Sequence, residues 1–127
     1  MDSEIALEWD EGEPDVAWKY RGVRVEKRFP EPPSSVVVWA NPPSVIVVEP
    51  IVSAGRLDNA IVFAPSGMER LRLVPPAVTS ERSWRLGYYA VFVSDGVLTA
   101  VFSTRIGDYW GVPNLETGEL EQVAEWR

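Results

Sequence analysis

Carboxylates are the only side chains of this chain that could serve as general acids and bases near neutral pH. The sequence holds no histidine and no cysteine, which excludes Ser-His-Asp and Cys-His catalysis, thiolate metal sites and structural disulfides. A glycoside hydrolase instead needs two carboxyl groups facing each other across a cleft. The densest group of acids near the C-terminus is Glu116, Glu119, Glu121 and Glu125. Three of them alternate along one strand whose other face is apolar, which is typical of a solvent-exposed face, so we expect no catalytic residues.

A second group of acids lies near the N-terminus, in the run Asp10-Glu11-Gly12-Glu13-Pro14-Asp15. Carboxylate oxygens and a glycine suit Ca²⁺ or Mg²⁺, but the spacing does not match a calcium-binding loop, and Pro14 removes flexibility that such a loop uses. The glycine-rich motifs that bind phosphate groups are absent from the sequence. We therefore expect no metal and no cofactor.

The net charge of −7 lies entirely in the first fifteen residues. This N-terminal arm, residues 1–15, carries seven acids and no base, whereas the other residues hold twelve acids and twelve bases. Such an arm repels nucleic acid and anionic lipid and attracts a basic protein surface. The alternative is a solvated terminus that only aids solubility. Trp9 lies inside the arm, where it either anchors a partner or packs the arm onto a sheet.

Two further segments combine charged and aromatic side chains. The first places five bases beside Trp18 and Tyr20: Lys19, Arg21, Arg24, Lys27 and Arg28. Sheets of this composition bind single-stranded nucleic acid, but the adjacent acidic arm and the overall acidity oppose that function. The second segment, residues 103–112, joins two strands and contains Arg105, Asp108, Tyr109 and Trp110. These residues could recognise a partner, or Arg105 and Asp108 could simply pair with each other.

The elements that must position these residues are β-hairpins. Eleven prolines and nine glycines predict frequent turns and few long helices. Alternating apolar and polar residues on either side of turn sequences predict four hairpins. They span residues 16–29, 59–74, 88–103 and 109–126, with turns at Arg21-Gly22, Pro65-Ser66-Gly67, Ser94-Asp95-Gly96 and Glu116-Thr117-Gly118. Between the first two, β-branched runs at 36–39 and 44–48 predict strands that are buried on both faces.

The predicted fold is all-β and mainly antiparallel: a single domain over residues 1–127, made of a meander of hairpins with at most one short helix. A twisted sheet, a sandwich and a partly open barrel all fit this pattern. Residues 79–86 favour a strand with Trp84, Leu86 and Tyr88 on one face, or else a helical turn or two capped by Ser80. In the last hairpin, we expect Leu120, Ala124 and Trp126 on one face and Glu119, Glu121 and Glu125 on the other.

The sequences of two segments determine the expected localisation. The N-terminus is acidic where a secretory signal would be basic. The most apolar stretch, residues 36–52, is interrupted by three prolines and a glutamate and does not suit a membrane span. The expected location is the bacterial cytoplasm.

The C-terminal third resembles the tails of small β-rich immunity proteins that are encoded beside bacterial polymorphic toxins. The resemblance is carried by Gly87-Tyr88-Tyr89, Val101-Phe102-Ser103-Thr104-Arg105, Gly107-Asp108 and Glu116-Thr117-Gly118-Glu119-Leu120. It covers roughly 40 residues and no catalytic motif. The resemblance implies that the chain binds a sibling toxin domain, often a nuclease or another nucleic-acid-modifying enzyme, and blocks it.

These observations predict a protein that binds a cognate toxin through a basic surface of that toxin and inhibits it by occlusion. The expected partner-binding residues are Trp9, Asp10, Glu11, Glu13, Asp15, Arg105, Asp108, Tyr109, Trp110, Glu116 and Glu119. We expect neither nucleic acid nor a membrane as a partner. An alternative is a small-molecule or carbohydrate-binding β-module that uses exposed tryptophans. A third hypothesis is a hydrolase that works with carboxylates alone.

Overall fold

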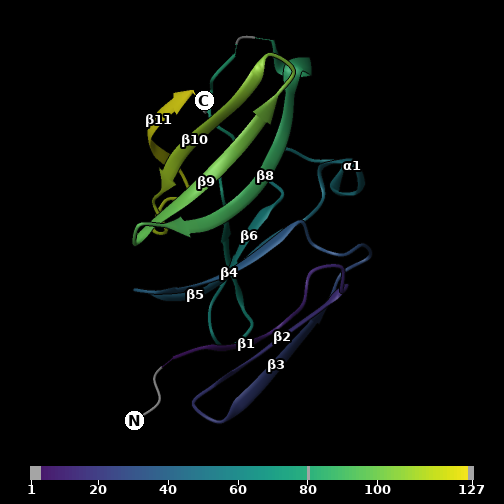
Figure 1. Ribbon diagram of the computed structural model, residues 1–127, viewed down its shortest axis with the longest axis vertical. Coiled ribbons are helices and arrows are strands. Elements are labelled where there is room, and N and C mark those ends of the chain that lie inside the picture. Colours follow the sequence, from purple (N-terminus) through teal and green to yellow (C-terminus); the bar gives the residue numbers. More distant parts are fainter. Residues whose placement is uncertain (1–3, 80, 126–127) are drawn as a thin grey trace.

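A computed structural model describes residues 4–79 and 81–125 of the chain. Over these residues, eleven strands form three antiparallel sheets, which confirms the all-β prediction. The three sheets are stacked as layers (Figure 1). Helical structure in the described ranges is limited to α1, Ile51–Ala54, and a single 3-10 turn, Arg82–Trp84.

The layers follow the order of the chain. The N-terminal sheet consists of β1 (Ala6–Glu8), β2 (Asp15–Tyr20) and β3 (Val23–Arg28). The central sheet consists of β4 (Ser35–Ala40), β5 (Pro43–Val48), β6 (Ala60–Phe63) and β7 (Glu69–Arg72). The C-terminal sheet consists of β8 (Arg85–Ser94), β9 (Val97–Thr104), β10 (Gly107–Pro113) and β11 (Leu120–Glu125), in the order β11-β10-β9-β8. All three sheets are open within the described residues, so the partly open barrel is not the architecture observed.

The inner strands of the central sheet, β5 and β6, are buried on both faces, as predicted for residues 44–48, whereas β4, at the edge of the sheet, is only partly buried, contrary to the prediction for residues 36–39. Successive side chains of a strand point to opposite faces, and paired residues of neighbouring strands share a face. Val45 and Val47 of β5 therefore join Ile61 and Phe63 of β6 in a core with Trp18 of the N-terminal sheet. The alternate residues of β5 and β6, which are Ile46, Val48, Ala60 and Val62, face the C-terminal sheet. They form a core with the inner side chains of that sheet, which are Tyr88, Val91, Leu98, Ala100 and Phe102.

Two of the predicted turns have the backbone that a two-residue hairpin loop requires. Both central residues of such a type I′ loop need a positive φ, which favours glycine, asparagine and aspartate. Arg21 and Gly22 have φ values of 50° and 81°, and Asp95 and Gly96 have 50° and 76°. The strands joined by these turns, β2–β3 and β8–β9, pair in continuous antiparallel registers apart from the irregularities near the start of β8.

The N-terminal arm is partly a strand. Ala6, Leu7 and Glu8 pair with Lys19, Trp18 and Ala17 of β2, so β1 forms one edge of the N-terminal sheet. Ile5, Leu7 and Trp9 pack against the core between the N-terminal and central sheets. Apolar burial therefore fixes the alternate residues of the arm, while its acids remain outside.

The segment before β8 differs from the predicted strand. Residues 82–84 form the 3-10 turn, and the strand begins only at Arg85. Register shifts between Arg85 and Gly87 and between Tyr88 and Ala90 then break the expected alternation. Leu86 is consequently exposed whereas Tyr88 is fully buried, so these two side chains do not share a face. The proposed cap, Ser80, lies outside the described residues.

The last hairpin also departs from simple alternation. Val112 pairs with Glu121 and Trp110 with Ala124, so β11 holds one extra residue between these pairs. Because paired residues share a face, Glu121 and Ala124 lie on the same face, contrary to the prediction. Gln122, within this bulge, has a φ of 56°. Trp126 lies outside the described residues.

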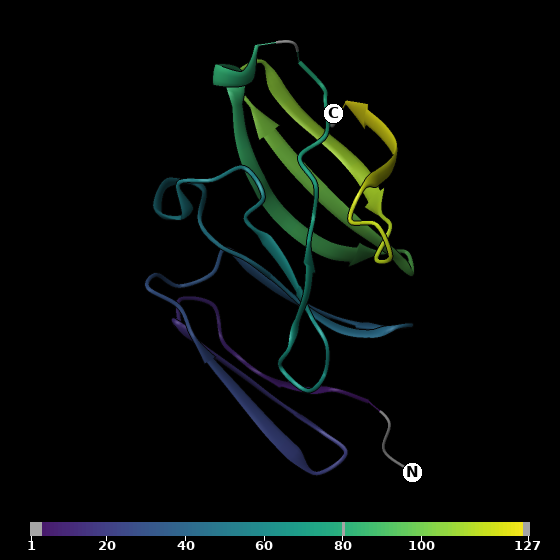
Figure 2. The ribbon, with the colours of Figure 1, turned by 180° about the vertical axis from the view of Figure 1, so that it is seen from behind.

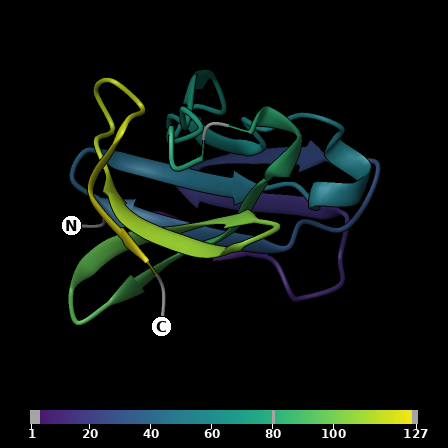
Figure 3. The ribbon, with the colours of Figure 1, turned by 90° about the horizontal axis from the view of Figure 1, so that it is seen from above.

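The connections run along the sides of the stack. From β7, residues 73–79 run without regular structure up the side of the C-terminal sheet to the 3-10 turn (Figure 2). Viewed down the stack, α1 lies at one side of the layers (Figure 3). The outer faces of the N-terminal and C-terminal sheets are thus left uncovered by the chain that connects them.

Candidate partner-binding surface

The residues expected to bind a partner lie in three separate places. Trp9 to Asp15 lie in the β1–β2 connection and at the start of β2, and Arg105 to Trp110 belong to the turn and strand that follow β9. Glu116 and Glu119 lie in the β10–β11 turn, at the opposite end of β10 and roughly 20 Å from its start at about 3.3 Å per residue. The N-terminal and C-terminal sheets cover opposite faces of the central sheet (Figure 1). The structure therefore does not bring these residues together into one surface.

Trp9 closes the acidic turn of the arm. Its indole Nε1 donates a hydrogen bond of 2.8 Å to the carbonyl oxygen of Glu13, while its ring packs against the core beneath the N-terminal sheet. The turn is closed a second time because Glu13 N donates to Asp10 O at 3.0 Å and Asp10 N donates to Glu13 Oε1 at 3.2 Å. Trp9 thus fastens the arm to the sheet.

The acids of the arm surround a hollow on the outer face of the N-terminal sheet. Ala17 of β2 lies between its cross-strand partners, Glu8 of β1 and Glu26 of β3. Because alanine is small, the carboxylates on either side rise above it and leave a groove of about 440 Å³. We call this the acidic groove, and its acidic lining consists of Glu8, Asp10, Glu13, Asp15 and Glu26.

Two arginines offset part of this charge. Arg24 lies 3.3 Å from Glu8 Oε1 and 3.8 Å from Glu26 Oε2, and it is the one base in the groove lining. Arg28 Nε approaches Asp15 Oδ1 only to 3.6 Å, beyond hydrogen-bonding distance, and its side chain is 80% exposed. Asp15 Oδ1 is buried and has no hydrogen-bond partner within the described chain. The five carboxylates therefore leave the groove negative.

Four of the five basic residues of the β2–β3 hairpin contact acidic or aromatic side chains of the fold. Arg24 and Arg28 meet the acids of the arm, as described above. Lys27 Nζ lies 5.2 Å from the centre of the Phe63 ring, on the inner face of the sheet. Arg21 lies over the ring of Tyr20 at 5.0 Å. This distribution does not favour the nucleic-acid interface that the composition of the hairpin could suggest.

The C-terminal candidates divide between the two faces of their sheet. Tyr109 pairs with Phe102, an inner core residue, whereas Trp110 pairs with Val101 and lies on the outer face. Within the described ranges, Arg105 and Asp108 form no ion pair with each other or with another residue. Glu116 and Glu119 are exposed in a turn that Asn114 organises, since its Oδ1 accepts hydrogen bonds from the backbone N–H groups of Glu116 and Thr117.

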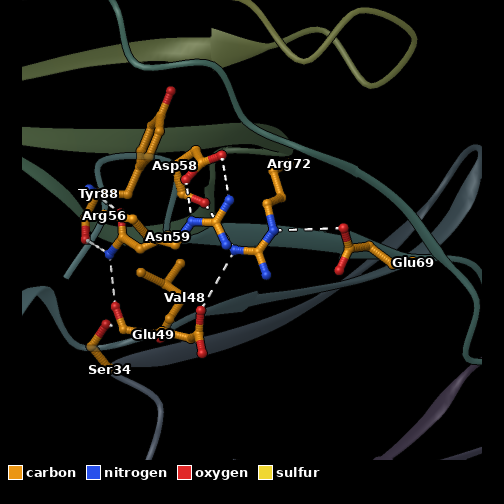
Figure 4. Close-up of polar contacts among 9 residues, drawn as sticks. All are labelled: Ser34, Val48, Glu49, Arg56, Asp58, Asn59, Glu69, Arg72 and Tyr88. Atoms are coloured by element: carbon orange, nitrogen blue, oxygen red, sulfur yellow. Dashed lines mark hydrogen bonds and ion pairs between the residues drawn. The ribbon is translucent and has the colours of Figure 1, made fainter. Parts of the chain in front are cut away.

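A polar cluster at the end of the central sheet holds the remaining candidates for acid–base chemistry (Figure 4). The guanidinium of Arg56 donates a hydrogen bond to each carboxylate oxygen of Asp58, at 2.5 and 3.0 Å. This hydrogen bonding lowers the pKa of the Asp58 carboxyl. Arg72 lies between Glu49 and Glu69, at 3.6 and 3.5 Å. The lowered pKa makes Asp58 a poor proton acceptor, and the pairing of all three carboxylates with arginines indicates a structural role for the cluster.

Buried groups beside this cluster join the central sheet to the C-terminal sheet. The side-chain amide of Asn59 donates to the carbonyl oxygens of Glu49 and Tyr88, at 2.7 and 2.8 Å, and Asn59 Oδ1 accepts from Tyr88 N at 2.7 Å (Figure 4). The phenol of Tyr88 donates to Val74 O at 2.6 Å, and burial raises its pKa. All of these partners lie within the fold, which indicates a structural role.

The predicted partner-binding residues did not include the row that forms the floor and sides of the acidic groove: Glu8, Ala17 and Glu26. The signal was present in the alternation Ile5-Ala6-Leu7-Glu8-Trp9, which is a strand pattern. Once β1 is placed beside β2, the register brings Glu8, Ala17 and Glu26 into one row across the sheet. The charge of the arm concealed this pattern, because the acids also suit a solvated terminus.

Neither a metal site nor a membrane helix emerges from the described part of the chain. There, no three carboxylates are arranged so that they could hold a metal ion. The helical segments between residues 4 and 125, Ser80 apart, are too short to cross a bilayer. Comparison of the chain with family models, curated proteins and solved structures finds no match.

Proposed function

We propose that the protein binds a basic partner protein through the acidic groove and inhibits it, in the manner of an immunity protein and its toxin. The observation that carries this proposal is the fixed array of five carboxylates over Ala17. Its acids come from β1, β2, β3 and the turn that Trp9 closes, so little conformational entropy opposes binding. A preformed acidic surface attracts a basic one over a long range and speeds its encounter.

The class of partner follows from the same electrostatics. Enzymes that act on nucleic acid carry a basic cleft for the phosphate backbone. An acidic groove competes for such a cleft, and the resemblance to immunity proteins favours a nuclease or another nucleic-acid-modifying toxin. The lack of histidine and cysteine and the pairing of Asp58, Glu49 and Glu69 with arginines favour stoichiometric inhibition over catalysis. The bacterial cytoplasm is the setting that we propose for this complex.

The partner is first identified by purifying the tagged protein from its native host and looking for a protein present at equal stoichiometry. The purified partner is then assayed for nucleic-acid cleavage or modification with and without one equivalent of this protein. We expect a basic toxin domain whose activity is suppressed. A partner that retains full activity, or the absence of any stoichiometric partner, would contradict the proposal.

Two charge-matched variants then locate the surface. The groove variant carries Asp10→Asn, Glu13→Gln and Asp15→Asn, and the control variant carries Glu116→Gln, Glu119→Gln and Glu121→Gln in the distant hairpin. At low salt, we expect the groove variant to slow association about tenfold and the control to change it much less, with the difference shrinking as salt rises. Equal effects of the two variants would assign the attraction to net charge and remove the role of the groove.

A further inference from the structure

The outer face of the C-terminal sheet contains a second hollow, of about 370 Å³, on the opposite side of the molecule from the acidic groove. We call it the apolar hollow, and it is lined by Phe92, Val97, Thr99, Trp110, Val112 and Gln122. Ser94 and Asp95, at the end of β8, complete its rim. Its size falls within the range of roughly 300–1,000 Å³ that small-ligand sites occupy, whereas a protein interface needs a much larger surface.

Aromatic and aliphatic side chains form the floor of this hollow. Trp110 and Val112 are alternate residues of β10 and point to the same outer face. Phe92 of β8 pairs with Thr99 of β9, which places both on this face as well. Thr99 is nearly fully buried although no other layer covers it, because its large neighbours shield it. The floor is therefore formed by side chains of three adjacent strands, β8, β9 and β10.

The bulge in β11 places Gln122 at the rim. A left-handed conformation costs a residue other than glycine about 1–2 kcal/mol, and Gln122 adopts it with a φ of 56°. Bulges in edge strands change the direction of a side chain and are frequent beside binding sites. Conformational strain of this kind is typical of functional positions. Here it adds an amide, with both donor and acceptor groups, to an otherwise apolar hollow.

Several polar groups around the hollow have capacity to bind a ligand. The indole N–H of Trp110, the side-chain amide of Gln122 and the hydroxyl of Ser94 form no hydrogen bond with any described residue. Asp95 is the single charged side chain of the lining, and it is exposed. The ligand must therefore offer an apolar surface to the floor and several hydrogen-bonding groups to the rim, without a negative charge.

We propose that the apolar hollow binds a neutral carbohydrate. One face of a pyranose ring carries C–H groups that pack against an indole ring, and its hydroxyls both donate and accept hydrogen bonds. Trp110 provides the stacking surface, Gln122 and Ser94 form hydrogen bonds with the hydroxyls, and the Asp95 carboxylate accepts hydrogen bonds from hydroxyls at the rim. An anionic ligand would be repelled by Asp95, and a purely apolar ligand would leave the N–H and amide groups unpaired.

The experiment is a titration of ¹⁵N-labelled protein with glucose, galactose, mannose, N-acetylglucosamine, maltose and cellobiose. The indole N–H resonance of Trp110 is assigned from its loss in Trp110→Phe. At about 10 mM sugar, which detects even a weak site, we expect one or more of these sugars to shift that resonance in a saturable manner. No shift with any of them would overturn the proposal, as would saturable binding of free indole without binding of a sugar.

Three variants test the roles of the lining residues. We expect Trp110→Ala to weaken binding of the best sugar at least about tenfold, since each tenfold change corresponds to about 1.4 kcal/mol. Gln122→Ala should weaken it several-fold. The matched control is Trp84→Ala, which removes an exposed tryptophan from the 3-10 turn and should leave the affinity unchanged. Unchanged affinity in Trp110→Ala, with the fold verified by the amide spectrum, would overturn the assignment.

A misfolded Trp110→Ala would be recognised by its amide spectrum, and Trp110→Phe then takes its place. Phenylalanine keeps an aromatic ring but lacks the indole N–H, so we expect binding to weaken several-fold, and unaltered affinity would count against the site. The triple groove variant Asp10→Asn, Glu13→Gln and Asp15→Asn should bind sugar as the unmodified protein does. The inhibitor proposal and the carbohydrate proposal can therefore fail independently.

Discussion

The outer faces of the N-terminal and C-terminal sheets differ in nearly every respect, although both sheets are antiparallel and both pack one face on the central sheet. The N-terminal sheet exposes alternating charges, and its hollow over Ala17 is lined by carboxylates. The C-terminal sheet exposes valines and aromatic residues, and its hollow has Trp110 and Phe92 in the lining. The inner faces, by contrast, are both apolar. Packing on the central sheet therefore constrains one face of each outer sheet and leaves the other free to specialise.

The largest expected effect tests whether the two inner faces contribute equally to stability. Trp18→Ala creates a cavity between the N-terminal and central sheets, and Phe102→Ala creates one between the C-terminal and central sheets. Both side chains are fully buried. We expect each substitution to lower the free energy of unfolding by about 3–5 kcal/mol. Chemical denaturation monitored by circular dichroism measures this loss. A much smaller loss for Trp18→Ala would show that the N-terminal sheet is attached less firmly than its burial implies.

A second pair of substitutions compares the polar links across the two interfaces. Asn59→Ala leaves the backbone N–H and C=O of Tyr88 without partners at the C-terminal interface, and we expect a loss of roughly 3 kcal/mol. Trp18→Phe removes one hydrogen bond, from Nε1 to Pro65 O, at the N-terminal interface, and should cost about 1–2 kcal/mol. Equal losses of unfolding free energy in denaturation experiments would contradict the explanation by the number of hydrogen bonds removed.

A smaller, pH-dependent change in stability is expected for the Arg56–Asp58 pair, which lies at one end of the central sheet. Arg56 lowers the pKa of Asp58 in the folded protein, so their interaction stabilises the fold above the unfolded pKa of about 3.9. Both side chains are partly exposed, and Asp58→Asn should cost no more than about 1 kcal/mol at pH 7. Denaturation at a series of pH values should show this cost shrinking as pH falls through the folded pKa. A cost that persists at lower pH would contradict the electrostatic explanation.

The smallest effect concerns the strained residue beside the apolar hollow. Gln122→Gly removes the left-handed strain, but glycine is more flexible in the unfolded chain, so we expect a stabilisation of no more than about 1 kcal/mol. Thermal unfolding measures it, and Arg21→Gly, in the β2–β3 turn, is the matched control with a φ of 50°. Sugar binding should weaken only in Gln122→Gly. If Gln122→Gly stabilised the protein without weakening sugar binding, the strained backbone at this position would have no role in the sugar site.

Local chemistry was sufficient to predict the hairpins and the buried strands. Turns such as Asp95-Gly96 determine their own backbone, and the β-branched run of β5 indicates burial on both faces without reference to any partner. The bulge at Gln122 could not be predicted in this way, because it depends on how β11 meets β10 and not on the residues of β11 alone. The stack of three layers was also beyond local patterns, which fitted a sandwich or a barrel equally well.

The candidate surfaces were harder to predict than the strands for a related reason. Asp10, Glu13 and Asp15 were recognised by their charge, but the groove exists only because Ala17 lies between Glu8 and Glu26 on neighbouring strands. In the same way, the sequence identifies Trp110 as an aromatic residue in a connecting segment. Phe92 and Gln122 line the same hollow as Trp110 only because of the order of the strands in the sheet. Composition identifies groups that can bind, and register determines which of them act together.

The match between chain order and layer order has a consequence for biosynthesis. On the ribosome, the N-terminal and central sheets can stack once β7 has left the exit tunnel, but the other face of the central sheet, with Ile46, Val48 and Val62, waits for β8 and β9. At about 5–20 residues per second, this apolar β-surface stays open for roughly 2–6 seconds during each round of translation. A chain that stalls or is cut in that interval presents an aggregation-prone sheet. We expect such nascent chains to engage chaperones, and the finished C-terminal sheet to end that dependence.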